Sequence, residues 1–353
     1  MKTRPLKNYQ GSIGVEVYDI DLTQDEEIFE LGKIVADQCV VFIDQGVVTQ
    51  RLYDIMTQWG SPSRALIHNY IVSQRLSGRH WRDLFLQLGY INNGMGELAG
   101  AVSRVSYLKD DRGRPKGIFS NGELDWHSDQ CAFDDAPRMI GLMSVSDSAS
   151  SQTQFMPTHD QFLSLSSAMQ SVVRELIVRH KWREGEEGCA PGLNREQTMI
   201  IHYNGVPLDG METRLYSETV TGRPGIKFPH FDFDGFVGMS QAESWKLYNE
   251  LKRHIYDDRY VYTQDWQDGQ IVFMDQEITL HKRPTNILDG DRRMMHRVIT
   301  YLNKINPSIQ PATKVRYNGV EYTHDEFAKL VDADRRKQYQ LELDEQEKLE
   351  AYQ

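Results

Sequence analysis

Residues 123–133 read ELDWHSDQCAF, a stretch that places His127 and Asp129 two positions apart. Side chains of a β-strand alternate between its two faces, so residues i and i+2 share a face and these two groups would converge on one point. A histidine and a carboxylate held in this way are two members of the 2-His-1-carboxylate facial triad, which binds iron(II) and leaves positions open. The stretch therefore predicts a metal edge on a strand, which one distant histidine would complete.

An H-x-D pair is weak evidence when it stands alone. The chain contains a second pair, His230 and Asp232, in PHFDFD at residues 229–234. A surface pair or a plain His–Asp hydrogen bond would explain either of them without a metal. The assignment therefore depends on a further feature of the chain.

That feature is LHKRPTNILDGDRRMMHRVITYL at residues 280–302. His281 follows a buried-looking strand, and Arg293 and Arg297 are four positions apart, so both share one face of an extended segment. Buried arginines need anionic partners, and the planar guanidinium fits a carboxylate with two hydrogen bonds. The segment predicts the missing histidine together with two binding sites for small anions.

An ion-pair network with Asp289 and Asp291 is the alternative explanation of the two arginines. The histidine and the upstream H-x-D pair favour the functional interpretation. His296 has the opposite strand parity and is expected to pack or hydrogen-bond outside the pocket.

The composition is that of an ordinary globular protein. The chain has 353 residues, 39% of them hydrophobic, and a net charge of −11 that disfavours nucleic-acid binding. No signal peptide and no apolar run long enough to cross a membrane is apparent. The three cysteines are widely spaced, which argues against a disulfide framework and favours a cytoplasmic location: Cys39, Cys131 and Cys189.

The hydrophobic pattern opens as α plus β and becomes richer in strands in the second half. Residues 1–306 are expected to form one domain with a lid or insertion plus hairpin at 71–120, and 307–353 a polar, largely helical tail. Helices are expected to begin at a Thr49 cap and at two capping boxes, Thr158 with Gln161 and Ser240 with Glu243. Strands are expected at residues 12–22, 40–44, 199–204, 259–266, 270–275 and 297–302.

With these motifs in this order, the chain resembles the family of taurine dioxygenase and 2,4-dichlorophenoxyacetate dioxygenase. The resemblance extends over most of the chain and implies a mainly β fold with flanking helices, the double-stranded β-helix or jelly roll, a squashed barrel. The motifs are GVEVYDIDL (14–22), VVFID (40–44), VVTQRLYDIMTQWGSP (47–62), WHSD (126–129), VTGRPGI (220–226), DWQDGQIVFMD (265–275) and RRMMHR (292–297).

Residue by residue, the resemblance implies that His127, Asp129 and His281 bind Fe(II). It implies that Arg293 binds the distal carboxylate of the co-substrate 2-oxoglutarate, with a hydroxyl contact from Thr153 in SSQTQF (150–155). The threonine alone carries this last match, because two serines stand where the family usually has glycines.

The resemblance also implies substrate contacts. Arg297 falls where the family holds an anionic group of the prime substrate, and His68 and Tyr70 fall in a region that supplies further contacts. His68 could equally be an ordinary loop histidine. The family often has W-D-N-R before the distal histidine, whereas residues 274–277 read MDQE, so an acidic residue, Glu277, replaces a basic one near the iron.

The implied activity is hydroxylation of an unactivated C–H bond by O2, with release of succinate and CO2. The substrate would be a small organic carboxylate, sulfonate, sulfate or phosphonate, and relatives are commonly homo-oligomers. Desaturation, cyclisation or oxidative cleavage at the same site is the first alternative. A non-catalytic β-barrel that binds a small acid is the second, although such a protein would not need an open iron site.

Overall fold

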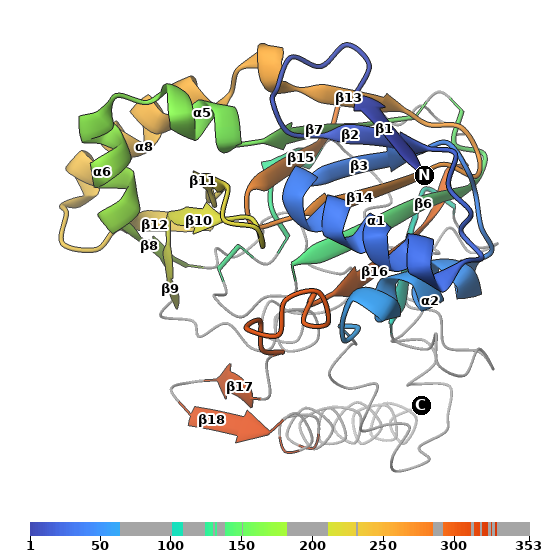
Figure 1. Ribbon diagram of the computed structural model, residues 1–353. Helices are drawn as coiled ribbons and strands as arrows, with labels where there is room; N and C mark the ends of the chain where they lie inside the picture. Colours follow the sequence, from blue (N-terminus) through green and yellow to red (C-terminus); the bar gives the residue numbers. More distant parts are fainter. Residues whose placement is uncertain are drawn as a thin grey trace, which may run out of the picture.

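The computed structural model describes residues 1–63, 101–108, 124–129, 131–132, 138–149, 151–181, 211–230, 232–284, 292–311, 314–317, 320–323, 326 and 329. Figure 1 shows two β-sheets that face each other, with helices packed on the outside. The fold is the expected one, a mainly β jelly roll. His68, Tyr70, strand 199–204 and most of segment 71–120 lie outside the described residues.

Within the described residues the larger sheet has seven strands, of which β2 and β3 pair in parallel and the other neighbours pair antiparallel. Its centre consists of VVFI, IVFMD and MIGLMSVS, whose almost unbroken apolar runs fit strands that are buried on both faces. The strands, in spatial order, are β1 (Lys2–Pro5), β2 (Val15–Tyr18), β3 (Val40–Ile43), β14 (Ile271–Asp275), β6 (Met139–Ser146), β16 (Met294–Thr300) and β4 (Val102–Ser106).

The smaller sheet has four antiparallel strands, in the order β13 (Tyr262–Asp265), β7 (Gln152–Pro157), β15 (Thr279–Arg283) and β5 (Leu124–His127). Its inner face packs against the larger sheet through one apolar cluster. Buried members of that cluster come from both sheets and include Val105, Ile140, Phe155, Tyr262, Val272, Met274 and Met295. The two sheets are therefore packed together through a shared apolar layer.

Helices α1 (Asp25–Gln38) and α2 (Thr49–Trp59) cover the outer face of the larger sheet (Figure 1). Trp59 packs edge-on against Phe273 of β14 with ring centroids 4.8 Å apart. The expected Thr49 cap is wrong, because Val48 is the N-cap residue and has no side-chain oxygen. The Thr49 hydroxyl instead lies 2.7 Å from Nδ1 of His296, which places that histidine on the outer face, as predicted.

A second apolar cluster packs several small strands and helices against the smaller sheet and includes Phe162, Val178, Phe228, Phe233 and Leu251. Its strands form two small sheets: β8 (Ile177–His180) between β9 (Met211–Arg214) and β12 (Phe233–Phe236), and β10 (Tyr216–Glu218) paired with β11 (Pro224–Ile226). Helices α5 (His159–Ser164), α6 (Ser167–Glu175) and α8 (Gln241–Ile255) pack around them.

One of the two capping boxes is present. Ser240 and Glu243 exchange both hydrogen bonds at the start of α8. Thr158 makes no cap, because its hydroxyl donates to backbone oxygens of Ile226 and Ile278 instead. The helical run that follows it breaks into two, and Ser166 caps the second helix by accepting from the backbone of Met169.

The described part of segment 307–353 includes a hairpin of β17 (Lys314–Tyr317) and β18 (Val320–Thr323), which the expectation of a largely helical tail did not foresee. Apart from residues 326 and 329, its expected helix lies outside the described residues. No helix in the described ranges is both long and apolar enough to cross a membrane.

Candidate metal centre and co-substrate site

The three predicted ligands lie on or next to two neighbouring strands of the smaller sheet. His127 is the last residue of β5, Asp129 lies in a turn two residues beyond it, and His281 lies in β15. Antiparallel pairing sets His281 directly opposite His127, so the two imidazoles face each other with ring centroids 4.1 Å apart. The sheet register therefore brings together residues separated by more than 150 positions in sequence.

One oxygen of Asp129 faces both histidines. Its Oδ1 atom lies 3.6 Å from Nε2 of His127 and 3.8 Å from Nε2 of His281. The three ligand atoms all lie within 4.8 Å of one another, a spacing that one metal ion can bridge. Two imidazole nitrogens and one carboxylate oxygen form the donor set of a facial-triad iron(II) site, so these residues fit the metal.

Hydrogen bonding of His127 and burial of His281 favour the forms of the two imidazoles that can bind a metal. The Nδ1 atom of His127 lies 2.6 Å from the backbone oxygen of Asp125, so it carries the ring proton and leaves Nε2 with its lone pair. Burial, with a smaller contribution from neighbouring His127, lowers the pKa of His281 to about 3. This ring is therefore neutral near pH 7 and can act as a ligand.

Arg297 lies against a predicted ligand. Its Nη1 atom is 2.6 Å from Oδ2 of Asp129, and its Nε atom donates to the hydroxyl of Ser103 at 3.1 Å. The arginine thus binds the carboxylate oxygen that faces away from the histidines. From the sequence, Arg297 was expected to bind an anionic group of the substrate. In this structure it binds the carboxylate of Asp129.

Arg293 is buried, with only 4% of its surface exposed, and its guanidinium lies over the ring of Tyr107 at 4.7 Å. Thr153, on β7, is also buried, and its hydroxyl accepts from the indole nitrogen of Trp266 at 2.9 Å. The structure therefore places both expected 2-oxoglutarate contacts inside the protein rather than on its surface.

The sequence interpretation missed Arg283. It lies two residues beyond His281 on β15, is 4% exposed, and approaches the same Tyr107 ring to 5.3 Å. Two buried guanidinium groups therefore flank one aromatic ring. The strand alternation used for His127 and Asp129 applies equally to His281 and Arg283, so the signal was present in the sequence.

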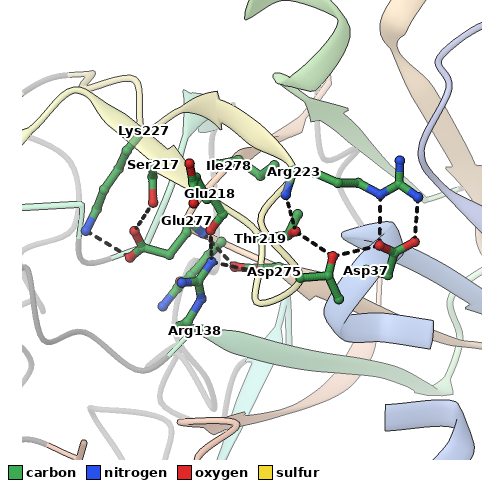
Figure 2. Close-up of polar contacts among 12 residues, drawn as sticks. Asp37, Arg138, Ser217, Glu218, Thr219, Arg223, Lys227, Asp275, Glu277 and Ile278 are labelled. Carbon is green, nitrogen blue, oxygen red and sulfur yellow. Dashed lines mark hydrogen bonds and ion pairs between the residues drawn. The ribbon is translucent and has the colours of Figure 1, made fainter. Parts of the chain in front are cut away.

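Ser128 anchors the H-x-D segment to β14. Its hydroxyl donates to the backbone oxygen of Gln276, which follows the last residue of that strand. Two buried ion pairs flank Gln276: Arg138 with Asp275 at 2.9 Å, and Lys227 with Glu277 at 2.9 Å (Figure 2).

These pairs explain the acidic residue at position 277. Lys227 is 5% exposed and Ser217 also donates to Glu277, at 2.8 Å. Burial alone would raise the pKa of Glu277, but the charges of Lys227 and Arg138 bring it below its ordinary value. The extra negative charge near the site is therefore neutralised locally by a lysine.

The rival pair, His230 and Asp232, is not arranged as a metal edge. Asp232 is held by His180 at 2.9 Å and by the thiol of Cys131 at 3.4 Å. Among the described residues, His230 belongs to neither of the two groups whose ligand atoms lie close enough to hold an ion.

Comparison with known proteins shows the family of this chain. Residues 2–299 match the family model described as "Taurine catabolism dioxygenase TauD, TfdA family". Pentalenolactone F synthase of Streptomyces arenae is 27% identical over 204 residues, covering 56% of this chain and 67% of that protein. An alkylsulfatase of Acinetobacter baylyi is 22% identical over 193 residues, covering 54% of this chain and 59% of that protein.

Solved structures show the same fold. A taurine dioxygenase from Burkholderia xenovorans superposes with a TM-score of 0.59 at 19% identity, covering 85% of this chain and 88% of its own. AAD-2 in complex with Mn(II) and N-oxalylglycine gives 0.59 at 15% identity, covering 85% and 97%. The family match over nearly the whole chain shows that this protein belongs to the TauD/TfdA family, the non-haem dioxygenases that use iron(II), 2-oxoglutarate and O2.

Proposed function

We propose that His127, Asp129 and His281 hold the iron and that the enzyme oxidises an unactivated C–H bond of a small anionic organic substrate. The observation that carries this proposal is the convergence of Asp129 Oδ1 with both Nε2 atoms, at 3.6 and 3.8 Å. Arg293, with the hydroxyl of Thr153, binds the distal carboxylate of 2-oxoglutarate. Both side chains are buried, which supports this role, because the attraction between a guanidinium and a carboxylate is stronger where water is excluded.

The bound iron, with 2-oxoglutarate and O2, supplies the oxidising power, and succinate and CO2 are released. The protein fixes the geometry. Arg297 holds Oδ2 of Asp129 so that Oδ1 remains directed at the metal position, and Ser128 ties the same segment to Gln276. The hydrogen bond from His127 to the Asp125 oxygen keeps the ring from rotating.

The substrate carries an anionic group that side chains of the protein bind. Arg297, His68 and Tyr70 are proposed to contact it, and a loop within residues 71–120 is proposed to cover the pocket. A single domain at residues 1–306 with a separate tail, a cytoplasmic location and a homo-oligomeric state also belong to the proposal. The similarity to pentalenolactone F synthase favours one further candidate, oxidation of a natural product with an outcome other than hydroxylation.

Anaerobic addition of iron(II) and 2-oxoglutarate tests the centre, because the chelate should give a weak charge-transfer band in the visible. Asp129→Ala should abolish both this band and succinate formation. Screening carboxylates, sulfonates, sulfates and phosphonates for substrate-dependent succinate release then identifies the substrate class. An unchanged band in Asp129→Ala would contradict the ligand assignment.

A further inference from the structure

A second buried cluster lies directly beyond the metal edge in the chain. A thiol, an imidazole and a carboxylate lie within 4.8 Å of one another here: they belong to Cys131, two residues after Asp129, His180, at the end of β8, and Asp232, just before β12. His180 is 1% and Asp232 7% exposed. No step of the proposed reaction uses these groups. Because burying polar groups costs free energy unless they are hydrogen-bonded, their burial calls for a structural reason.

The cluster is satisfied internally. The carboxylate of Asp232 accepts from His180 Nδ1 at 2.9 Å and from Cys131 Sγ at 3.4 Å. His180 Nε2 lies 2.7 Å from the hydroxyl of Thr213, which is also 3.5 Å from the backbone oxygen of Cys131. The network therefore holds Cys131 through its side chain and through its main chain.

Charge keeps this network in one arrangement. Burial alone would raise the pKa of Asp232, but the charge and hydrogen bond of His180, with the thiol of Cys131, bring it below its ordinary value. An ionised carboxylate is an acceptor only, so both neighbours must donate to it. The main chain of Asp232 is held as well, because the Lys181 amide donates to the backbone oxygen of Asp232 at 2.7 Å.

Two anchors hold residues 127–131, which we call the ligand segment. The network fixes its end at Cys131, and Ser128 fixes it next to Asp129. The Ser128 hydroxyl is bound to the oxygen of Gln276, while Cys131 is fixed to Asp232 and Thr213. Asp129 lies between these two anchors, and its own carboxylate is held by Arg297. Because Asp129 follows the last residue of β5, no further strand pairing fixes its backbone.

We propose that His180 and Asp232 are positioning residues for the iron site, which act through Cys131 to hold Asp129 in the geometry that the metal requires. This inference rests on the proposed role of Asp129 as a ligand. Loss of such supporting contacts typically weakens metal affinity by about 10- to 100-fold. His180→Asn should therefore raise the dissociation constant for iron(II) at least about 10-fold, measured anaerobically from the charge-transfer band at saturating 2-oxoglutarate.

His159→Asn is the matched control. His159 is also buried, at 6% exposure, and its Nδ1 lies 2.6 Å from the backbone oxygen of Pro224, away from the ligand segment. It should lower the melting temperature of the metal-free protein without changing iron affinity by more than about twofold. Cys131→Ser, which keeps a donor for Asp232, should retain tighter iron binding than Cys131→Val.

The outcomes separate the possibilities. If the wild type gives no band, the proposed function fails. If the wild type binds iron and His180→Asn binds it equally well, or weakens it only as much as His159→Asn does, the positioning role is wrong. Metal analysis adds one arm: a second bound divalent ion that disappears in Cys131→Val would show that the cluster is itself a metal site, and would overturn the inference.

Discussion

Arg297 and Asp129 form an ion pair in which Nη1 lies 2.6 Å from Oδ2, while Oδ1 of the same carboxylate faces His127 and His281. The Asp129 carboxylate thus presents one oxygen to the Arg297 guanidinium and its second oxygen to the predicted metal position. Both side chains of the pair are 13% exposed, so water screens the contact only weakly. Arg297 therefore connects the metal site to β16 and, through Ser103, to β4.

Replacing Arg297 should weaken iron binding as well as turnover. Arg297→Gln leaves Oδ2 of Asp129 without its charged donor, so we expect the dissociation constant for iron(II) to rise about 10-fold or more. Ser103→Ala removes only the second contact of the arginine and should have a smaller effect. Anaerobic iron titration measures both. Wild-type iron affinity in Arg297→Gln would restrict the arginine to substrate binding.

Arg293 should affect the co-substrate and not the metal. A hydrogen bond to a charged group contributes about 1.5–3 kcal/mol, so Arg293→Gln should raise KM for 2-oxoglutarate by roughly 10- to 100-fold. Iron binding without 2-oxoglutarate should stay unchanged, as followed by quenching of intrinsic tryptophan fluorescence. Thr153→Val, which removes one neutral hydroxyl, should raise KM less. Equal loss of iron affinity in Arg293→Gln would contradict the assignment.

The Arg138–Asp275 pair should be costly to break. Asp275 is fully buried and Arg138 is 17% exposed, so Asp275→Ala leaves a buried charge without its main partner. We expect the free energy of unfolding, measured in urea, to fall by roughly 3–5 kcal/mol. The double variant Arg138→Met with Asp275→Leu should recover much of that loss. A double variant no more stable than Asp275→Ala would show that packing and not charge dominates.

The Lys227–Glu277 pair can be tested by exchange. Glu277→Arg sets two cations side by side in a buried place and should destabilise the protein by several kcal/mol, about the penalty for an uncompensated buried charge. Adding Lys227→Glu restores opposite charges and should recover most of the stability. Thermal unfolding of the two variants measures this. Equal melting temperatures would mean that the two side chains are not coupled.

His296 should make the protein sensitive to acid. Burial, with a smaller contribution from the charge of Arg104, lowers the pKa of His296 to about 4, whereas an unfolded histidine titrates near pH 6.5. Between these values only the unfolded chain takes up the proton, so stability falls as the pH drops from about 6.5 to 4. The loss is roughly 3 kcal/mol at most.

His296→Gln should therefore remove the part of this acid-dependent loss that His296 contributes and leave the part that buried His281 contributes, as measured by urea unfolding at each pH. Thr49→Ala is the control, because it removes the partner at 2.7 Å but leaves the ring buried, and it should keep the acid-dependent loss. A wild-type slope in His296→Gln would assign the sensitivity to another group.

The sequence was most informative where a pattern reports on local geometry. Helix α1 forms over Asp25–Gln38, where apolar residues recur at helical spacing. The sequence was least informative about hydroxyl groups, because the side chains of Thr49 and Thr158 hydrogen-bond to residues distant in sequence instead of capping helices. A capping motif states only that a local hydrogen bond is available, and tertiary contacts compete for the same oxygen.

The site divides in the same way. The H-x-D spacing predicted that His127 and Asp129 lie together, although β5 ends at His127 and Asp129 lies in a turn beyond it, and parity alone put His296 on the other face of its strand from Arg297. Only the tertiary structure set His281 opposite His127, turned Arg297 onto Asp129, and joined Cys131 to His180 and Asp232. Register between distant strands and the partner of a buried charge depend on the packing of the whole chain, which no local pattern encodes.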